Sequence, residues 1–154
     1  MLRDLLAPDA RWMKRALREA ERAFEAGEVP VGAIVVRDGV VVGKGHNQVE
    51  ALQDPTAHAE ILAVTAACAT LGAKFLDDCT LYVTLEPCPM CAGALVMARL
   101  KRLVFGAFDE KAGAASTLYN VVQDRRLNHQ IEVVSGVEAE ASAALLREFF
   151  RSKR

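Results

Sequence analysis

The sequence predicts an α/β protein, a three-layer α/β/α sandwich around a mixed sheet of about five strands. Short β-branched runs alternate with stretches of helical periodicity after an initial hairpin, and turn residues stand at the boundaries between them. No repeat or linker divides the 154 residues, a length that suits one domain with a substantial core. A single domain over residues 1–154 is therefore expected.

The first predicted elements are a helix over residues 9–26 and a β-hairpin. The apolar positions of the helix recur at helical spacing and are Met13, Leu17, Ala20 and Phe24. Gly27 stands where such a helix ends. Two β-branched runs follow, residues 31–36 and 40–42, and the Asp38-Gly39 pair between them predicts a hairpin.

A second helix is predicted from Asp54-Pro55, with Asp54 as its cap and Pro55 in its first turn, to about Leu71, before Gly72. The next predicted elements are strand 80–85, a helix over about 88–100, strand 102–105, strand 131–134 and helix 138–150. Residues 106–128 have weak periodicity and predict a loop with at most one helical turn.

The third predicted helix is apolar nearly all round, because Arg99 is the one polar residue from Ala92 to Leu100. Such a helix is usually buried on more than one side. The sheet would cover one side, and a second copy of the chain is a candidate for the other.

Composition excludes several classes of protein. No apolar run approaches the length of a membrane helix, and the N-terminus lacks the pattern of a secretion signal, so a cytoplasmic protein without a membrane partner is expected. The net charge of −1 excludes a protein that coats nucleic acid by charge alone. In a reducing compartment, closely spaced cysteines favour metal ligands over disulfides.

Two short segments, His58-Ala59-Glu60 and Pro87-Cys88-Pro89-Met90-Cys91, carry the chemistry. A Cys-x-x-Cys pair at a helix start can hold a metal with both sulfurs, and the positive end of the helix dipole favours the thiolates. His58 can supply a third ligand. Three protein ligands plus a water is the catalytic zinc arrangement, so one Zn²⁺ per chain is predicted.

Glu60 is the candidate proton shuttle. Zinc can lower the pKa of a bound water from about 15.7 towards about 7, which gives hydroxide as the nucleophile. Glu60 would accept the water's proton and pass it to the ring nitrogen and then to the leaving amine. Residues two apart on a regular helix do not share a face, so His58 and Glu60 can both reach one zinc only if they lie at the first turn. The helix that contains Glu60 is therefore expected to begin nearer Ala57 than Pro55.

His-x-Glu followed by Pro-Cys-x-x-Cys is the signature of the zinc nucleobase deaminases. From Trp12 to Arg151 the chain also resembles the tRNA adenosine deaminase family of the TadA type, in the cytidine deaminase-like superfamily. The segments that carry this resemblance are Glu28–Ala33, Gly45–Asn47, Asp54–Ile61, Leu81–Cys88, Asp109 with Lys111 and Gly113–Ala115, Asn128-His129 and Phe149–Arg151.

The resemblance implies the cytidine deaminase-like fold and hydrolytic deamination of adenosine to inosine at the wobble position of a tRNA anticodon. It also implies a homodimer, with tRNA and not DNA as the native substrate. Asn47 would hold the nucleoside. The other substrate-contacting residues that it implies are Val29, Pro30, Leu85, Glu86, Asp109, Lys111, Phe149 and Arg151.

The chain departs from the family at Phe108, where a polar or basic residue is common, and in detail at Ser116–Tyr119. These changes leave the RNA contacts of this loop open, and Phe108 could stack on a base. Without the resemblance, Asn47 could simply brace a turn. Of Phe149 and Phe150, one is expected in the core and the other at the site or in a dimer.

Two alternatives remain open. A deaminase of a free base such as guanine or cytosine would share the zinc ligands and Glu60. A non-catalytic zinc module would need a fourth protein ligand. Its candidates are His46, Cys68, Cys79 and His129. None has ligand spacing; the two cysteines suit buried thiols, His46 suits packing, and His129 suits a loop hydrogen bond or an RNA contact equally.

Overall fold

The computed structural model describes residues 2–153, with side chains from residue 8 onward. Five strands form one sheet in the order β2-β1-β3-β4-β5. The strands are β1 (Gly32–Arg37), β2 (Val40–His46), β3 (Thr80–Leu85), β4 (Arg102–Ala107) and β5 (Glu132–Val134). β1 pairs antiparallel with β2 and β3, whereas β4 runs parallel to both β3 and β5, so the sheet is mixed.

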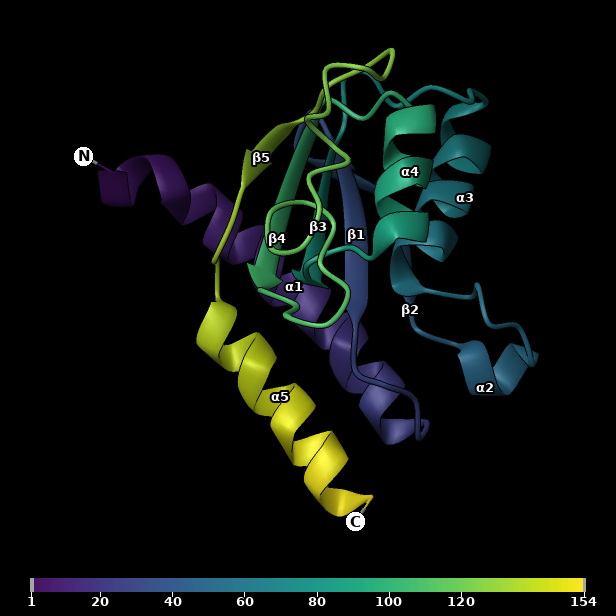
Figure 1. The fold of residues 1–154 in the computed structure, drawn as a ribbon, viewed down its shortest axis with the longest axis vertical. Coiled ribbons are helices and arrows are strands. Elements are labelled where there is room, and N and C mark those ends of the chain that lie inside the picture. The colour runs from purple at the N-terminus through teal and green to yellow at the C-terminus, as the bar shows by residue number, and fades with distance from the viewer. Residues whose placement is uncertain (1, 154) are drawn as a thin grey trace.

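Helices cover both faces of this sheet (Figure 1). They are α1 (Leu2–Glu25), α2 (Val49–Leu52), α3 (Ala59–Leu71), α4 (Pro89–Met97) and α5 (Ala139–Ser152). α3 and α4 pack together on one face, while α1 and α5 lie on the other. The three-layer α/β/α sandwich predicted from the sequence is confirmed.

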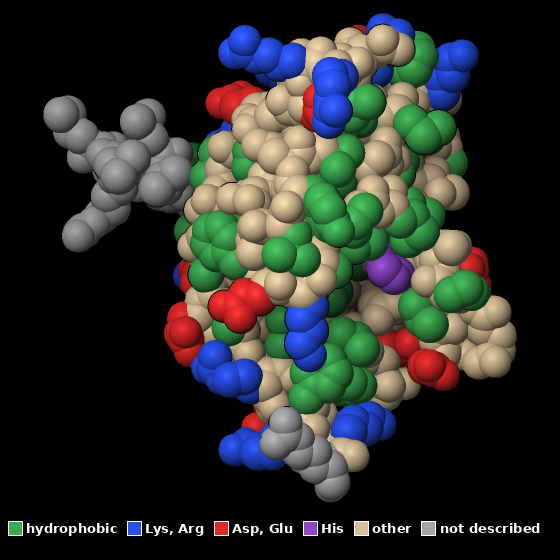
Figure 2. Space-filling view, in the orientation of Figure 1, with side chains coloured by type: hydrophobic (Ala, Val, Ile, Leu, Met, Phe, Trp, Pro, Cys, Tyr) green, Lys and Arg blue, Asp and Glu red, His purple; other side chains and the backbone are tan. Residues whose placement is uncertain are grey.

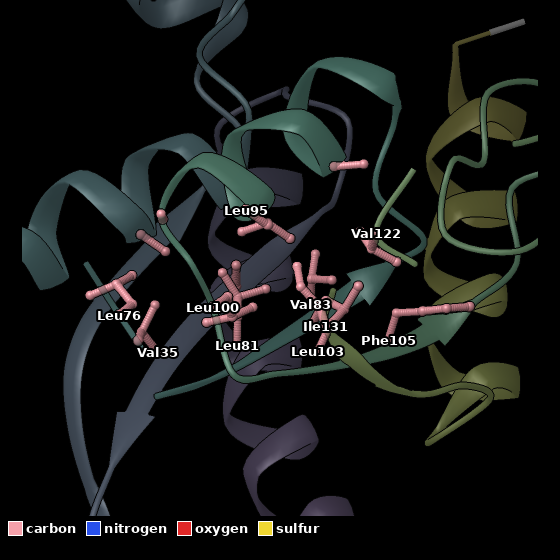
Figure 3. Close-up of a cluster of buried hydrophobic side chains, with 14 of the residues drawn as sticks. Val35, Leu76, Leu81, Val83, Leu95, Leu100, Leu103, Phe105, Val122 and Ile131 are labelled. Atoms are coloured by element: carbon pink, nitrogen blue, oxygen red, sulfur yellow. The ribbon is translucent and has the colours of Figure 1, made fainter. Parts of the chain in front are cut away.

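The larger hydrophobic core lies between the sheet and the α3–α4 layer (Figure 3). Leu81 and Val83 of β3 and Leu103 of β4 lie beneath Leu95 of α4, all fully buried. A smaller core on the α1 side joins Met13 to side chains of β1, β3 and β4. Because β3 and β4 are covered on both faces, their positions are fixed by burial on both sides.

The predicted turns are confirmed. Asp38 and Gly39 both have positive φ, 51° and 74°, as a type I′ hairpin turn requires. Gly27, with φ 79°, ends α1: its N–H donates to the Phe24 carbonyl at 3.0 Å, while the N–H of Glu28 donates to that of Ala23 at 2.9 Å. The start of α1 differs from the prediction, because the helix begins at Leu2 and includes Pro8.

Two glycines of β2 set the distance between α3 and the sheet. A Cβ atom on Gly43 would lie 2.5 Å from the Ala63 carbonyl oxygen, and one on Gly45 would lie 2.6 Å from that of Ala59. Neither position can carry a side chain while the helix backbone keeps its place. The first turn of α3 is thereby held against the sheet beside His58.

The start of α3 corrects one prediction. Asp54 does not cap a helix; its side chain accepts the Thr56 N–H at 2.8 Å in a local turn, and α3 begins at Ala59 with His58 as its N-cap. The short helix α2 was not predicted. A helix of four residues is too short for its periodicity to be recognised.

The end of α4 and the following loop also differ in detail. α4 ends at Met97, three residues before the predicted Leu100, because Arg99 adopts the left-handed conformation usually left to glycine (φ 54°). The described stretch 108–131 contains turns and one isolated bridge, Ala115 to Asn120, and no helix. Among the described residues, no helix is both long and apolar enough to cross a membrane.

A polar cluster ties α1 to the central strands. The buried carboxylate of Asp9 accepts two hydrogen bonds from Arg102, at 2.8 and 2.6 Å, and one from the Tyr82 hydroxyl at 2.9 Å. Burial alone would raise the pKa of Asp9, but the bonds from Arg102 and Tyr82 lower it below 3.8. This cluster lies on the α1 face of the sheet, whereas α3 and α4 cover the opposite face.

Candidate metal centre and pocket

The structure brings His58, Cys88 and Cys91 together as a group that can hold a metal ion. Their ligand atoms all lie within 4.8 Å of one another, and the His58 Nδ1 is 3.6 Å from each sulfur. Three groups meet here, and within the described part of the chain no fourth His, Cys, Asp or Glu joins them. Three protein ligands are typical of catalytic zinc, and four of structural zinc.

Both halves of this group stand at helix N-termini. His58 is the N-cap of α3 and Cys88 the N-cap of α4, each with an extended backbone. Pro89 occupies the first turn of α4, where its missing N–H leaves no hydrogen bond unmade. Because an N-cap side chain is free of the helical repeat, His58 and Glu60 can approach one centre although they are two residues apart.

The three candidate ligands shift one another's pKa values. The hydrogen bond from the Cys91 thiol lowers the pKa of Cys88, and the bond from His58 lowers it further. The same bond to Cys88, together with burial, raises the pKa of Cys91. The pKa of His58 is raised mainly by its bond to Cys88. Cys88 is therefore the first thiolate of the group, at the positive end of the α4 dipole.

Glu60 lies in the first turn of α3, 4% exposed. Burial raises its pKa from 4.5 to about 7. A carboxyl group with a pKa near neutrality can both accept and release a proton at neutral pH. It is a neighbour of the metal-binding group and not a member of it.

A cavity of about 780 Å³ opens over this group. His58, Glu60 and Cys88 form one part of its wall, and the C-terminal residues Phe149 and Lys153 another. Most of the predicted substrate-contacting residues also border it: Val29, Asn47, Leu85, Glu86, Asp109 and Phe149. Residues far apart in the sequence thus meet around the candidate metal centre.

Asn47 borders the cavity and also braces its wall. Its side-chain amide donates to the Val29 carbonyl at 3.2 Å and accepts the Val49 N–H at 3.3 Å. Next to it, the buried Glu28 carboxylate accepts the N–H groups of Glu50 and Ala51, at 2.9 and 2.8 Å. These bonds hold α2 at the cavity. All but the Asn47–Val49 bond join residues about twenty positions apart, which no sequence pattern could indicate.

Glu86 contributes a carboxylate that the loop 109–117 surrounds. It is 1% exposed and accepts the N–H groups of Asp109, Ala115 and Thr117, at 3.0, 3.2 and 2.9 Å, and the Thr117 hydroxyl. Burial opposes its charge, but the bonds from Thr117, Asp109 and Ala115 lower its pKa below 4.5. Both oxygens are engaged by the chain itself.

Three predicted contact residues do not border the cavity. Pro30 is buried beside it, and Lys111 is exposed on the loop 109–117. Arg151 forms an exposed ion pair with Glu148 and borders a separate surface depression with Phe150.

The two consecutive phenylalanines divide as predicted. Phe149 is 6% exposed, Phe150 is 50% exposed, and both rings border the cavity. Lys153, whose ammonium lies 5.3 Å from the centroid of the Phe149 ring, also borders it. Phe108 packs edge-on against Phe105 and is 49% exposed outside the cavity wall.

The remaining histidines and cysteines have other surroundings. His129 Nε2 lies 2.6 Å from the Leu100 carbonyl oxygen, a loop hydrogen bond, and Cys79 is a buried thiol. Cys68 and His46 are partly buried, and neither belongs to the metal-binding group of the described residues.

Comparison with known proteins identifies the family. The family model of the MafB19-like deaminases matches residues 8–154. The chain belongs to this deaminase family. The deaminase is 50% identical to the tRNA-specific adenosine deaminase of Bacillus subtilis (strain 168) over 149 residues, which are 97% of this chain and 92% of the relative.

Solved structures of deaminases resemble the structure of this chain. A tRNA:A34 deaminase, studied for A-to-I editing at the wobble position of transfer RNA, is 43% identical, with a TM-score of 0.85 over 88% of this deaminase and 99% of that chain. A guanine deaminase from Bacillus subtilis is 47% identical over 62% of each chain, with a TM-score of 0.60. Structures with both substrate classes thus resemble this deaminase, but the likeness to the tRNA enzyme extends over more of the chain.

Proposed function

We propose that this deaminase hydrolyses adenosine to inosine at the wobble position of a tRNA anticodon. The observation that carries the proposal is the His58, Cys88 and Cys91 group with Glu60 beside it, in a chain that is 50% identical to a tRNA-specific adenosine deaminase over nearly its whole length. In the reaction, a water oxygen replaces the exocyclic amine at C6 of adenine, and ammonia leaves.

One Zn²⁺ per chain is the metal that this donor set suits. Two sulfurs and one imidazole nitrogen are soft and borderline ligands, which zinc takes in tetrahedral sites. His58, Cys88 and Cys91 would hold it. When bound, zinc supplies a Lewis acid that lowers the pKa of a water molecule towards neutrality.

Glu60 moves the protons in this proposal. A hydrolytic deamination needs a group that takes a proton from water and delivers protons to the ring nitrogen and the departing amine. A buried carboxyl group with a pKa of about 7 is suited to both transfers. Its burial also keeps bulk water from competing for the proton.

The cavity suits a nucleotide of a single-stranded loop. Its volume of about 780 Å³ exceeds what one purine base occupies, and its wall offers the aromatic rings of Phe149 and Phe150 with the ammonium of Lys153. Aromatic rings stack on bases, and an ammonium group attracts phosphate. A base in an anticodon loop can be turned into such a cavity without opening a duplex. Asn47 and Asp109 are the polar groups that we assign to the target nucleoside, with Val29 and Leu85 as its apolar neighbours.

The cytoplasm, where tRNA is found, is the compartment that fits this function.

We also propose a homodimer that buries the outer side of α4. Met97 of α4 is 79% exposed and Met90 is 37% exposed. Apolar side chains gather on the face that Figure 2 shows, the view in which α4 lies in front of the sheet in Figure 1. Exposed apolar patches of this kind favour protein association. Sedimentation equilibrium should give about twice the monomer mass of 16.7 kDa, and Met97→Glu should give monomers. A wild-type monomer at micromolar concentration would contradict the dimer.

The alternative substrate is a free base, guanine in particular, because a guanine deaminase is 47% identical over part of the chain. The test offers the purified protein an anticodon stem-loop with adenosine at the wobble position, and separately free guanine, cytosine and adenosine. We expect inosine in the stem-loop and no ammonia from guanine, cytosine or free adenosine. Ammonia from guanine with an unchanged stem-loop would overturn the tRNA substrate while keeping the deaminase chemistry.

A further inference from the structure

Glu86 occupies a position that the sheet fixes. It directly follows β3, and its N–H donates to the Ala107 carbonyl at the end of β4 at 2.8 Å. Its side chain is 1% exposed. A buried carboxylate is unfavourable unless hydrogen bonds or cations compensate its charge. The groups that compensate the charge of Glu86 therefore indicate its role.

The compensation comes from one loop. Four donors from Asp109, Ala115 and Thr117 point at the two oxygens. Within the described residues, Glu86 forms no ion pair with a Lys, Arg or His side chain. The loop 109–117 therefore wraps around an anion that belongs to the sheet and not to the loop.

Gly113 allows this wrapping. A Cβ atom at this position would lie 2.4 Å from Glu86 Oε1 and 2.5 Å from the Asp109 carbonyl oxygen. Its N–H donates to that same Asp109 carbonyl at 2.9 Å. At Gly113 the loop therefore bonds to its own backbone and also packs against the Glu86 carboxylate.

The wrapped loop sets one side of the cavity. Asp109 donates its N–H to Glu86, and its own carboxylate accepts the N–H groups of Lys111 and Ala112, at 3.0 and 3.2 Å. Asp109 and Ala112 border the cavity. The orientation of the Asp109 side chain is therefore fixed through backbone groups whose own position depends on Glu86.

We propose that Glu86 is a positioning residue, which holds the loop 109–117 in the conformation that places Asp109 at the substrate. It acts through the loop and makes no side-chain contact with substrate, because both of its oxygens accept bonds from the chain. This inference rests on the proposed function for the identity of the substrate, but the loop's dependence on Glu86 can be measured without any substrate.

Glu86→Gln tests it with little change of volume. A glutamine offers one acceptor oxygen, and its NH₂ group would face N–H donors of the loop. Hydrogen–deuterium exchange of the Asp109, Ala115 and Thr117 amides should accelerate about tenfold or more, as expected for the loss of a charge-assisted bond. The KM for the stem-loop should rise about tenfold with a smaller change in kcat, since only the placement of a binding group is disturbed. The bound metal should stay at the wild-type level.

Two further variants give a second test and a control. Thr117→Val removes only the hydroxyl donor and should change exchange and KM in the same direction, by a smaller factor. Glu28→Gln alters another buried carboxylate at the cavity, one that accepts N–H groups of Glu50 and Ala51. It should leave exchange in the loop 109–117 unchanged.

The outcomes separate the two proposals. A wild-type protein that leaves the stem-loop unchanged overturns the proposed function, while the exchange data still decide whether Glu86 orders the loop. Wild-type exchange and KM in Glu86→Gln would overturn the positioning role. If Glu86→Gln does not fold, wild-type exchange and KM in Thr117→Val would overturn it instead.

Discussion

Glu60 and the three candidate ligands have different neighbours, and so their removal should have different effects. Glu60 is held by the first turn of α3, and its burial raises its pKa to about 7. His58, Cys88 and Cys91 face one another. Loss of a ligand should therefore release the metal, whereas loss of the Glu60 carboxylate should remove proton transfer alone.

Glu60→Gln should retain about one metal per chain and lower kcat by about 10²-fold or more, as expected when a general acid–base group is lost. Metal analysis and single-turnover assays on one preparation measure both quantities. Cys88→Ala is the matched variant and should lose the metal together with activity. A Glu60→Gln protein with substantial turnover would refute the proton-shuttle role.

The sequence predicted the candidate ligands and Glu60, which lie in two short motifs. It did not predict the contacts between segments that are distant in the sequence. His58 with Glu60, and Cys88 with Cys91, are close in the chain, so spacing and helix position suffice to pair them. The donors to Glu86 lie 23 to 31 residues further along. No periodicity or propensity relates a strand end to a loop at that separation.

The position of α3 depends on its close contact with the sheet beneath it. Gly45 of β2 faces the Ala59 carbonyl, and α3 begins at this residue directly after His58. Any displacement of this end of the helix moves a candidate metal ligand.

Gly45→Ala should lower the free energy of unfolding by about 1–3 kcal/mol, the usual effect of overpacking a close contact, and should weaken metal binding as well. Urea denaturation and metal titration measure the two effects. Gly93→Ala in the monomeric Met97→Glu background is the control, because within one chain a Cβ atom at Gly93 meets nothing within 4 Å and alanine favours a helix. Wild-type stability and metal affinity in Gly45→Ala would contradict this contact.

The elements predicted well are those with complete local signals. The Asp38-Gly39 turn, the apolar run 80–85 and Gly27 each carry their own signal, and all three are confirmed. The errors lie where tertiary contacts override such signals. Asp54-Pro55 looks like a helix start but forms a turn, and α2 exists because Glu28 accepts its first N–H groups.

Across the whole molecule, the Asp9, Tyr82 and Arg102 cluster joins the α1 layer to the sheet. The pKa of Asp9 is lowered below 3.8 in the folded protein, so its ion pair stabilises the fold fully above about pH 4. That stabilisation is lost as the pH falls through the lowered pKa.

Asp9→Asn should lower the free energy of unfolding at pH 7 by about 3 kcal/mol, because it leaves Arg102 without its buried partner. The difference between variant and wild type should shrink as the pH falls below about 4. Urea denaturation across this range measures it. Glu140→Gln, in an exposed pair with Arg147, should change little at either pH. A difference that stays constant with pH would contradict the assignment.

Mass spectrometry of an anticodon stem-loop deaminated in ¹⁸O-labelled water tests hydrolysis by this deaminase. The metal-loaded deaminase should give inosine that carries one ¹⁸O atom at C6. The metal-stripped protein should give none until zinc is restored. Unlabelled inosine, or undiminished activity after the metal is removed, would contradict hydrolysis at the His58, Cys88 and Cys91 centre.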